Sequence, residues 1–209
     1  MTVAGFGAGL LPTGFALGAF ALGALVAGRA LFRHYPHDHL GYCNAITLLR
    51  LALTAALVAP LVAGAPGSWL VFVVAICALG LDGVDGWLAR RQGYVSEFGA
   101  RFDMEVDSAL ALVMATGAAV QSGLGPLALL LGLPRYVFGA AARVWPWMRR
   151  DLPERFSRKV VCVIQLGVLI ALQAPVLPSA LAVALGLGAA LALTWSFAVD
   201  LLWLWRRRA

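Results

Sequence analysis

Long apolar stretches separated by short polar connections dominate the chain. Seven such stretches can be delimited, at residues 4–28, 46–66, 68–89, 104–121, 124–146, 159–174 and 178–204. Most are close to the ~20 residues that a helix needs to cross the hydrocarbon core of a bilayer. A transmembrane barrel would instead show segments of about ten residues with alternating polarity, and this pattern is absent from the sequence. The pattern therefore predicts an all-α integral membrane protein.

Composition supports this class. Hydrophobic residues make up 62% of the 209 residues and charged residues 12%, whereas a water-soluble domain has roughly 45–50% and about 25%. The first stretch, 4–28, begins with MTVAG and lacks the basic segment that opens a signal peptide. We therefore expect it to be retained as a helix.

Basic residues are distributed unevenly between the connections. They occupy alternate ones, as Arg29, Arg33, Arg90, Arg91, Arg101, Arg143, Arg149, Arg150, Arg155, Arg158, Lys159, Arg206, Arg207 and Arg208. Because Lys and Arg beside membrane helices stay on the cytoplasmic side, the N-terminus is predicted outside and the C-terminus inside. The net charge of +6 then faces the anionic leaflet, and we expect a bacterial inner membrane with the functional site at the cytoplasmic face.

Cysteine and histidine offer no convincing metal site. Cys43, Cys77 and Cys162 have no metal-ligand spacing and are interpreted as packing residues. The histidines of the HYPHDH segment, residues 34–39, lie between two apolar stretches beside tyrosines. An interfacial connector explains that segment better than a zinc site.

Six of the ten acidic residues fall within residues 81–110, which join two apolar stretches. An aspartate in a spanning helix costs about 2.5–3.5 kcal/mol at the centre of the bilayer on insertion scales. Several together are tolerated only if they face a polar cavity or bind cations. The concentration of acids therefore marks a functional region.

Helical spacing predicts how four of these acids cooperate. Asp82 and Asp85 share one helix face, and Asp103 and Asp107 share another. A turn around residues 93–97 makes the two helices antiparallel neighbours, so the carboxylates converge. Hard oxygen ligands select Mg²⁺, Mn²⁺ or Ca²⁺, and two such ions about 3.5–4 Å apart suit a displacement at phosphorus.

The acids belong to a longer pattern with fixed spacing, Asp82-x2-Asp85-Gly86-x2-Ala89-Arg90-x8-Gly99-x3-Asp103-x3-Asp107. It resembles the signature of the CDP-alcohol phosphotransferase family at every fixed position. The resemblance implies a six-helix core over residues 46–204, with one additional helix before it. We accordingly divide the chain into an N-terminal helix with its connector, 1–45, and a six-helix domain, 46–209.

The resemblance also implies the chemistry. A CDP-linked lipid such as CDP-diacylglycerol would transfer its phosphatidyl group to an alcohol, with release of CMP. The four aspartates would hold two divalent cations, Mg²⁺ or Mn²⁺, and Asp107 would also act as general base. The positions around the nucleotide are Gly86, Ala89, Arg90 and Gly99. Taken alone, Gly86 and Gly99 are equally compatible with close helix packing.

A polar segment at the start of the second stretch, Asn44-Ala-Ile-Thr47-Leu-Leu-Arg50, resembles the part of the family that approaches the diphosphate. Asn44 and Thr47 are therefore candidate CDP-binding residues, and the N-terminus of a helix favours phosphate. The alternative is an ordinary helix start, with Asn44 as N-cap and Arg50 reaching to the membrane surface.

Arg135 is the basic residue that departs from the alternation, because it lies about 16 Å from the cytoplasmic end of its stretch. An intramembrane arginine marks a functional site or a structural ion pair. Together with Arg143, Arg158 and Lys159 it is a candidate site for an anionic acceptor, although the last three also fit a basic membrane flank. Asp200 is interpreted as balancing Arg206–Arg208.

Glycerol 3-phosphate is the predicted acceptor. Inositol phosphate, serine, choline or phosphatidylglycerol are alternatives that the signature does not separate. An intramembrane prenyltransferase would need a second Asp-rich motif after Asp107, and a cation transporter commonly shows internal repeats; the sequence contains neither feature. We expect a homodimer among membrane lipids, as the resemblance implies, and no nucleic-acid partner.

Overall fold

The computed structural model describes residues 9–207 except 38, 66, 151 and 154, and every regular element in this part is a helix. The helices are α1 (Leu10–His34), α2 (Gly41–Ala56), α3 (Val58–Val62), α4 (Trp69–Gln92), α5 (Glu97–Gln121), η1 (Gly125–Ala128), α6 (Leu129–Gly132), α7 (Pro134–Val144), η2 (Pro146–Arg149), α8 (Phe156–Ala171) and α9 (Ser179–Arg206). The seven apolar stretches coincide with these helices, which confirms the all-α prediction. Residues 4–8 of the first stretch and Arg208 lie outside the described residues.

Prolines divide two of the predicted helices. α2 gives way to α3 at Leu57, because Pro60 has no N–H to bond the carbonyl one turn earlier. The segments Gly125–Gly132 and Pro134–Val144 are bent by 58° at Leu133, directly before Pro134. Each break shortens a helix that the apolar pattern predicts as continuous.

Four described segments are long and apolar enough to cross a bilayer: Leu10–Arg33, Gly41–Val62, Trp69–Gln92 and Ser179–Arg206. The bent pair makes a fifth if it is one span. α5 is long enough but carries four acidic residues in its first half, and α8 has only 16 residues. These features confirm an integral membrane protein.

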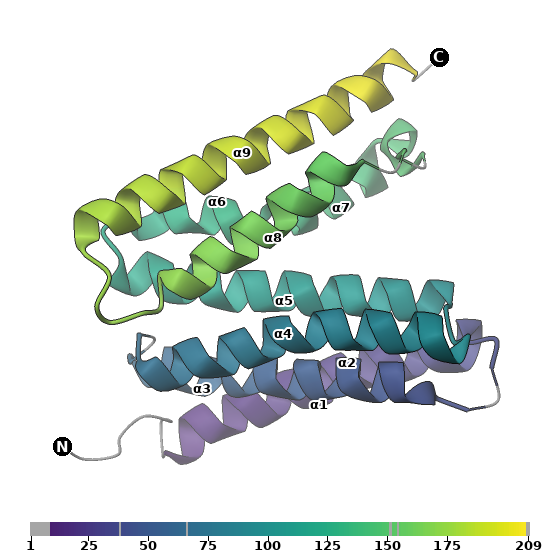
Figure 1. The fold of residues 1–209 in the computed structure, drawn as a ribbon, viewed down its shortest axis with the longest axis horizontal. Coiled ribbons are helices and arrows are strands. Elements are labelled where there is room, and N and C mark those ends of the chain that lie inside the picture. Colours follow the sequence, from purple (N-terminus) through teal and green to yellow (C-terminus); the bar gives the residue numbers. More distant parts are fainter. Residues whose placement is uncertain (1–8, 38, 66, 151, 154, 208–209) are drawn as a thin grey trace.

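The helices run back and forth, so alternate connections lie at the same end of the bundle (Figure 1). One end collects the α1–α2 connector, the α4–α5 turn, the α7–α8 connection and the C-terminus, and the N-terminus lies at the other. The connections rich in basic residues therefore share one end, as the sequence predicts.

α2 lies among α1, α4 and α5 and packs against all three. Its central position buries polar side chains that would otherwise face lipid: Asn44, Thr47, Arg50 and Thr54. Asn44, Thr47 and Arg50 have hydrogen-bond partners inside the bundle, as the burial of polar groups requires, whereas Thr54 Oγ1 has none among the described residues. The partners of Thr47 and Arg50 are aspartates of α4 and α5, and they define the candidate site.

Candidate active site

A tight turn places the end of α4 beside the beginning of α5. Gly93 ends α4 in the left-handed conformation (φ 73°), which glycine adopts without steric cost. Tyr94 N–H then donates to Ala89 O over 3.1 Å. Ser96 caps α5, its Oγ accepting from Gly99 N–H at 3.0 Å. The reversal confirms the predicted antiparallel pair.

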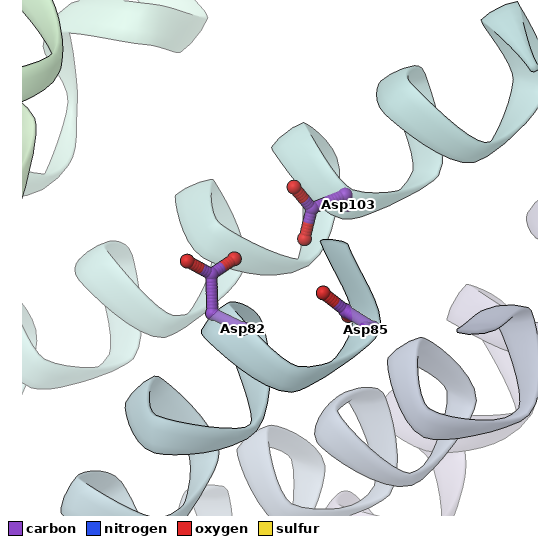
Figure 2. A group of neighbouring side chains, drawn as sticks. All are labelled: Asp82, Asp85 and Asp103. Carbon is purple, nitrogen blue, oxygen red and sulfur yellow. The ribbon is translucent and has the colours of Figure 1, made fainter. Parts of the chain in front are cut away.

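Three of the four predicted carboxylates converge across this pair. Asp82 and Asp85 project from α4 and Asp103 from α5, and one oxygen from each lies within 4.8 Å of the others (Figure 2). Asp85 is almost fully buried, whereas the side chains of Asp82 and Asp103 remain 36% and 37% exposed. Asp107 lies outside this group of three but is joined to it through Arg50.

Arg50 of α2 contacts all four aspartates. Its Nη1 pairs with Asp85 Oδ2 at 2.8 Å and with Asp103 Oδ1, and its Nη2 pairs with Asp82 Oδ1 at 2.9 Å and with Asp107 Oδ1. The side chain is 1% exposed. The interpretation in which Arg50 reaches to the membrane surface is therefore wrong, because its counter-charges lie inside the bundle.

This role of Arg50 is not among the predictions made from the sequence, although a signal for it is present. Arg50 lies within an apolar stretch, three residues after Thr47 and hence on the same helix face. An arginine inside a membrane stretch indicates a functional site or an ion pair, and this holds for Arg50 as it does for Arg135. The nearest cluster of acids would have been the expected partner of Arg50.

A cavity of about 310 Å³ adjoins the carboxylates. It is lined by Cys43, Asn44, Thr47, Asp85, Gly86, Ala89, Arg90, Tyr94, Val95, Ser96, Gly99, Ala100 and Asp103. All six residues that the sequence predicts for CDP binding are among them. The structure thus gathers residues from α2, α4 and α5 around one space, next to the acidic cluster.

The two signature glycines have different surroundings. A Cβ on Gly99 would lie 3.1 Å from Ser96 Oγ and 3.4 Å from Asn44 Oδ1, so the approach there is tight. A Cβ on Gly86 would meet only Arg90 Nη1, at 3.5 Å. Helix packing therefore does not require glycine at position 86, whereas position 99 brings α5 close to α2.

Asn44 is held by the connector that precedes α2. Its Nδ2 donates to Leu40 O at 2.6 Å and to Tyr35 Oη at 3.0 Å. Since α2 begins at Gly41 and has Leu40 at the N-cap position, Asn44 lies within the helix, and the N-cap interpretation is wrong. In the same connector, the ring of His37 contacts the rings of Tyr35 and Tyr94.

The predicted acceptor residues lie apart from the cavity. Arg135 pairs with Glu105 at 2.5 Å, and Arg143 is exposed on α7. Arg158 pairs with Asp200 at 2.9 Å, beside Lys159 at the start of α8. None of these four basic residues is among the residues that line the 310 Å³ cavity.

Two further predictions need correction. Asp200, which is 6% exposed, is part of a local charge balance, but its partners among the described residues are Arg155 and Arg158. Cys43 is buried, but Cys77 and Cys162 are exposed, so only the first is a packing residue. The helical pattern does not distinguish an exposed cysteine from a buried one.

The model of the CDP-alcohol phosphatidyltransferase family matches residues 41–199. The chain belongs to the CDP-alcohol phosphatidyltransferase family. The match begins with α2 and extends to the last third of α9, so α1 precedes it. No curated protein and no solved structure is similar enough to the chain to count as a match.

Membership in the CDP-alcohol phosphatidyltransferases makes this chain a membrane enzyme that transfers a phosphatidyl group from a CDP-alcohol. The family depends on divalent cations. The donor set fits such a cation, because Asp82, Asp85 and Asp103 offer only carboxylate oxygens, which Mg²⁺ and Mn²⁺ prefer over softer ligands.

Proposed function

We propose that this enzyme moves a phosphatidyl group from a CDP-linked lipid such as CDP-diacylglycerol to an alcohol and releases CMP. The observation that carries the proposal is the shared wall of the cavity: all six predicted CDP-binding residues line it together with Asp85 and Asp103. A nucleotide diphosphate bound there would have its phosphates beside the acidic cluster.

Asp82, Asp85, Asp103 and Asp107 are the proposed ligands of two divalent cations. The four carboxylates and Arg50 together leave three negative charges unbalanced, which favours binding of cations. When bound, Mg²⁺ or Mn²⁺ would neutralise the diphosphate and stabilise the phosphate of the departing CMP. The side chains of Asp82 and Asp103 are partly exposed, so a cation could reach them.

The residues of the cavity wall have separate proposed roles. Thr47 orients the Asp85 carboxylate through its hydroxyl, at 2.9 Å. Asn44, fixed by Tyr35 and Leu40, presents Oδ1 toward Gly99. Gly86 and Ala89 leave room for the nucleotide, and Arg90 supplies a positive charge for its phosphates.

Asp107 is the proposed general base. It lies one helical turn beyond Asp103 on α5, and it meets Arg50 through Oδ1. The acceptor hydroxyl would give its proton to this carboxylate while its oxygen bonds to the β-phosphorus of the donor, and the bond to CMP breaks. A direct displacement of this kind needs no covalent enzyme intermediate.

We propose an anionic acceptor, with glycerol 3-phosphate as the first candidate. Arg158 and Lys159 lie in the first turn of α8, and Asp200 pairs with Arg158 and with Arg155 there. Arg135 and Arg143 on α7 would add positive charge. Inositol phosphate, serine, choline and phosphatidylglycerol are the other acceptors to test.

The proposed orientation puts the site at the cytoplasmic face of a bacterial inner membrane, with the N-terminus outside. Its support is the shared end of the basic connections (Figure 1). We retain the division into an N-terminal helix with its connector, 1–45, and a six-helix domain, 46–209. Homodimerisation is proposed from family membership.

The experiment supplies purified protein with CDP-diacylglycerol, Mg²⁺ or Mn²⁺ and each acceptor in turn, and follows CMP release. Release that depends on the metal and on one acceptor supports the proposal, and the acceptor that gives the fastest release identifies the second substrate. Metal uptake into protein-containing vesicles with no CMP formed would favour a cation transporter. Transfer from a prenyl diphosphate would favour a prenyltransferase.

A further inference from the structure

We propose that Arg50 is the positioning residue of the aspartate site: its planar guanidinium sets the arrangement of all four carboxylates across α4 and α5. This inference rests on the proposed function, because it assigns a role within the same metal site. The proposed role depends on the shape of the guanidinium, and another positively charged group at position 50 would not fill it.

The contacts of Arg50 are distributed in a regular way. Nη1 joins Asp85 of α4 to Asp103 of α5, and Nη2 joins Asp82 of α4 to Asp107 of α5. Each terminal nitrogen thus links one carboxylate from each helix. A single side chain from α2 fixes the relative position of the two faces that form the site.

The guanidinium is itself held in place. Its Nε donates to Ala78 O of α4 at 3.1 Å, and the residue is 1% exposed in the packed region between α2, α4 and α5. Thr47, one turn earlier on α2, donates to the same Asp85 oxygen that accepts from Nη1. Arg50 therefore has little freedom to follow a displaced carboxylate.

The same contacts use one oxygen of each carboxylate. Arg50 meets Asp82, Asp103 and Asp107 through Oδ1 and Asp85 through Oδ2. Engaging one oxygen fixes the rotation of the carboxylate and leaves the second oxygen for a cation or a proton. Partners of this kind orient metal ligands, and their loss typically costs about 10–100-fold in metal affinity.

Lysine cannot replace this arrangement. Arginine presents several N–H donors in a rigid planar fork, whereas lysine has one compact ammonium on a flexible stem. An ammonium at this site keeps the positive charge but cannot link both pairs of carboxylates at once. The Arg50→Lys variant therefore separates geometry from charge.

The test measures Mn²⁺ binding by electron paramagnetic resonance in purified protein without lipid substrate. It compares wild type, Arg50→Lys and Arg50→Gln, with thermal unfolding as a check on folding. Both variants are expected to bind Mn²⁺ at least about tenfold more weakly than wild type. In turnover assays Arg50→Lys should lower kcat more than it raises the KM of the acceptor.

The matched control is Arg91→Lys. Arg91 is an exposed arginine on α4 whose guanidinium lies 5.0 Å from the Trp87 ring, away from the carboxylates. Its substitution should leave Mn²⁺ affinity unchanged. If Mn²⁺ affinity falls only in the variants at position 50, the loss is due to the missing guanidinium among the aspartates.

Unchanged Mn²⁺ affinity in Arg50→Lys overturns the inference. Tighter Mn²⁺ binding in Arg50→Gln also overturns it, because Arg50 would then only compete with the cation for the carboxylates. If Arg50→Lys does not fold, the single variant Asp82→Asn is compared with the double variant Asp82→Asn/Arg50→Lys. The Asp82→Asn change removes one negative charge from the cluster and so reduces the repulsion that could unfold the lysine variant. Weaker binding in the double variant supports the inference, and equal binding overturns it. Failure of the proposed function gives a different result: the wild-type protein would bind Mn²⁺ but form no CMP.

Discussion

Thr47 and Asp85 are joined across α2 and α4 by a hydrogen bond of 2.9 Å from the threonine hydroxyl to Asp85 Oδ2. The same oxygen accepts from Arg50 at 2.8 Å. Asp85 is 4% exposed, so its charge depends on these two donors in place of water. The bond connects a residue of the cavity wall directly to the acidic cluster.

Thr47→Val should weaken this connection while keeping the shape of the side chain. A hydrogen bond to a charged group contributes about 1.5–3 kcal/mol, so we expect Mn²⁺ affinity and turnover to fall by about tenfold or more. The measurements are Mn²⁺ titration and initial rates of CMP release. Thr194→Val on α9 is the control, because its hydroxyl donates to Ala190 O of its own helix. Equal effects at both positions would contradict a specific role for Thr47.

Gly99→Ala should reduce CDP binding without unfolding the protein. The added methyl would lie 3.1 Å from Ser96 Oγ and 3.4 Å from Asn44 Oδ1, and so would crowd the cavity wall. We expect a loss of CDP affinity of about tenfold, or ~1.4 kcal/mol, measured by calorimetric titration.

Gly167→Ala provides the comparison for that variant, because a methyl there meets no atom within 4 Å. Alanine is the better helix former by about 1 kcal/mol. This control should keep full CDP affinity with equal or higher thermal stability. CDP affinity that is unchanged in Gly99→Ala would remove position 99 from the proposed nucleotide site.

Asp107→Asn should abolish turnover and preserve binding of the CDP-linked lipid. The amide keeps the size of the side chain but cannot accept the proton of the acceptor hydroxyl, and loss of a general base typically costs about 10²–10⁴-fold in rate. Glu97→Gln on the same helix is the control, since that side chain is 77% exposed and pairs with Arg101 one turn away. Wild-type turnover in Asp107→Asn would show that the base is another group.

Much of this site could be predicted from the sequence because the signature has fixed spacing and the helices have a known period. The position of Asp82, Asp85 and Asp103 on two facing helices follows from that period and from one turn at Gly93. The role of Arg50 does not follow, because helical spacing within α2 gives its face but not the helices that surround it. The bend at Pro134 likewise depends on tertiary packing, since proline can end a helix or kink it.

Arg158→Gln should raise the KM of an anionic acceptor and change kcat little. Removing this charge weakens a proposed phosphate contact at the start of α8 and leaves Asp200 with Arg155 as its remaining described partner. We expect an increase in KM of about tenfold for glycerol 3-phosphate and none for an uncharged alcohol. Arg101→Gln, at a 70% exposed position paired with Glu97, is the control. An equal increase for both kinds of acceptor would argue against a phosphate contact.

The most direct test of the central claim compares the amounts of CMP and of new phospholipid formed from CDP-diacylglycerol by the purified wild-type enzyme. The account predicts equal molar amounts of the two products, formation that requires a divalent cation and an alcohol acceptor, and loss of both products together in Asp107→Asn. CMP formed without a matching phospholipid, or no CMP with any acceptor, would contradict it.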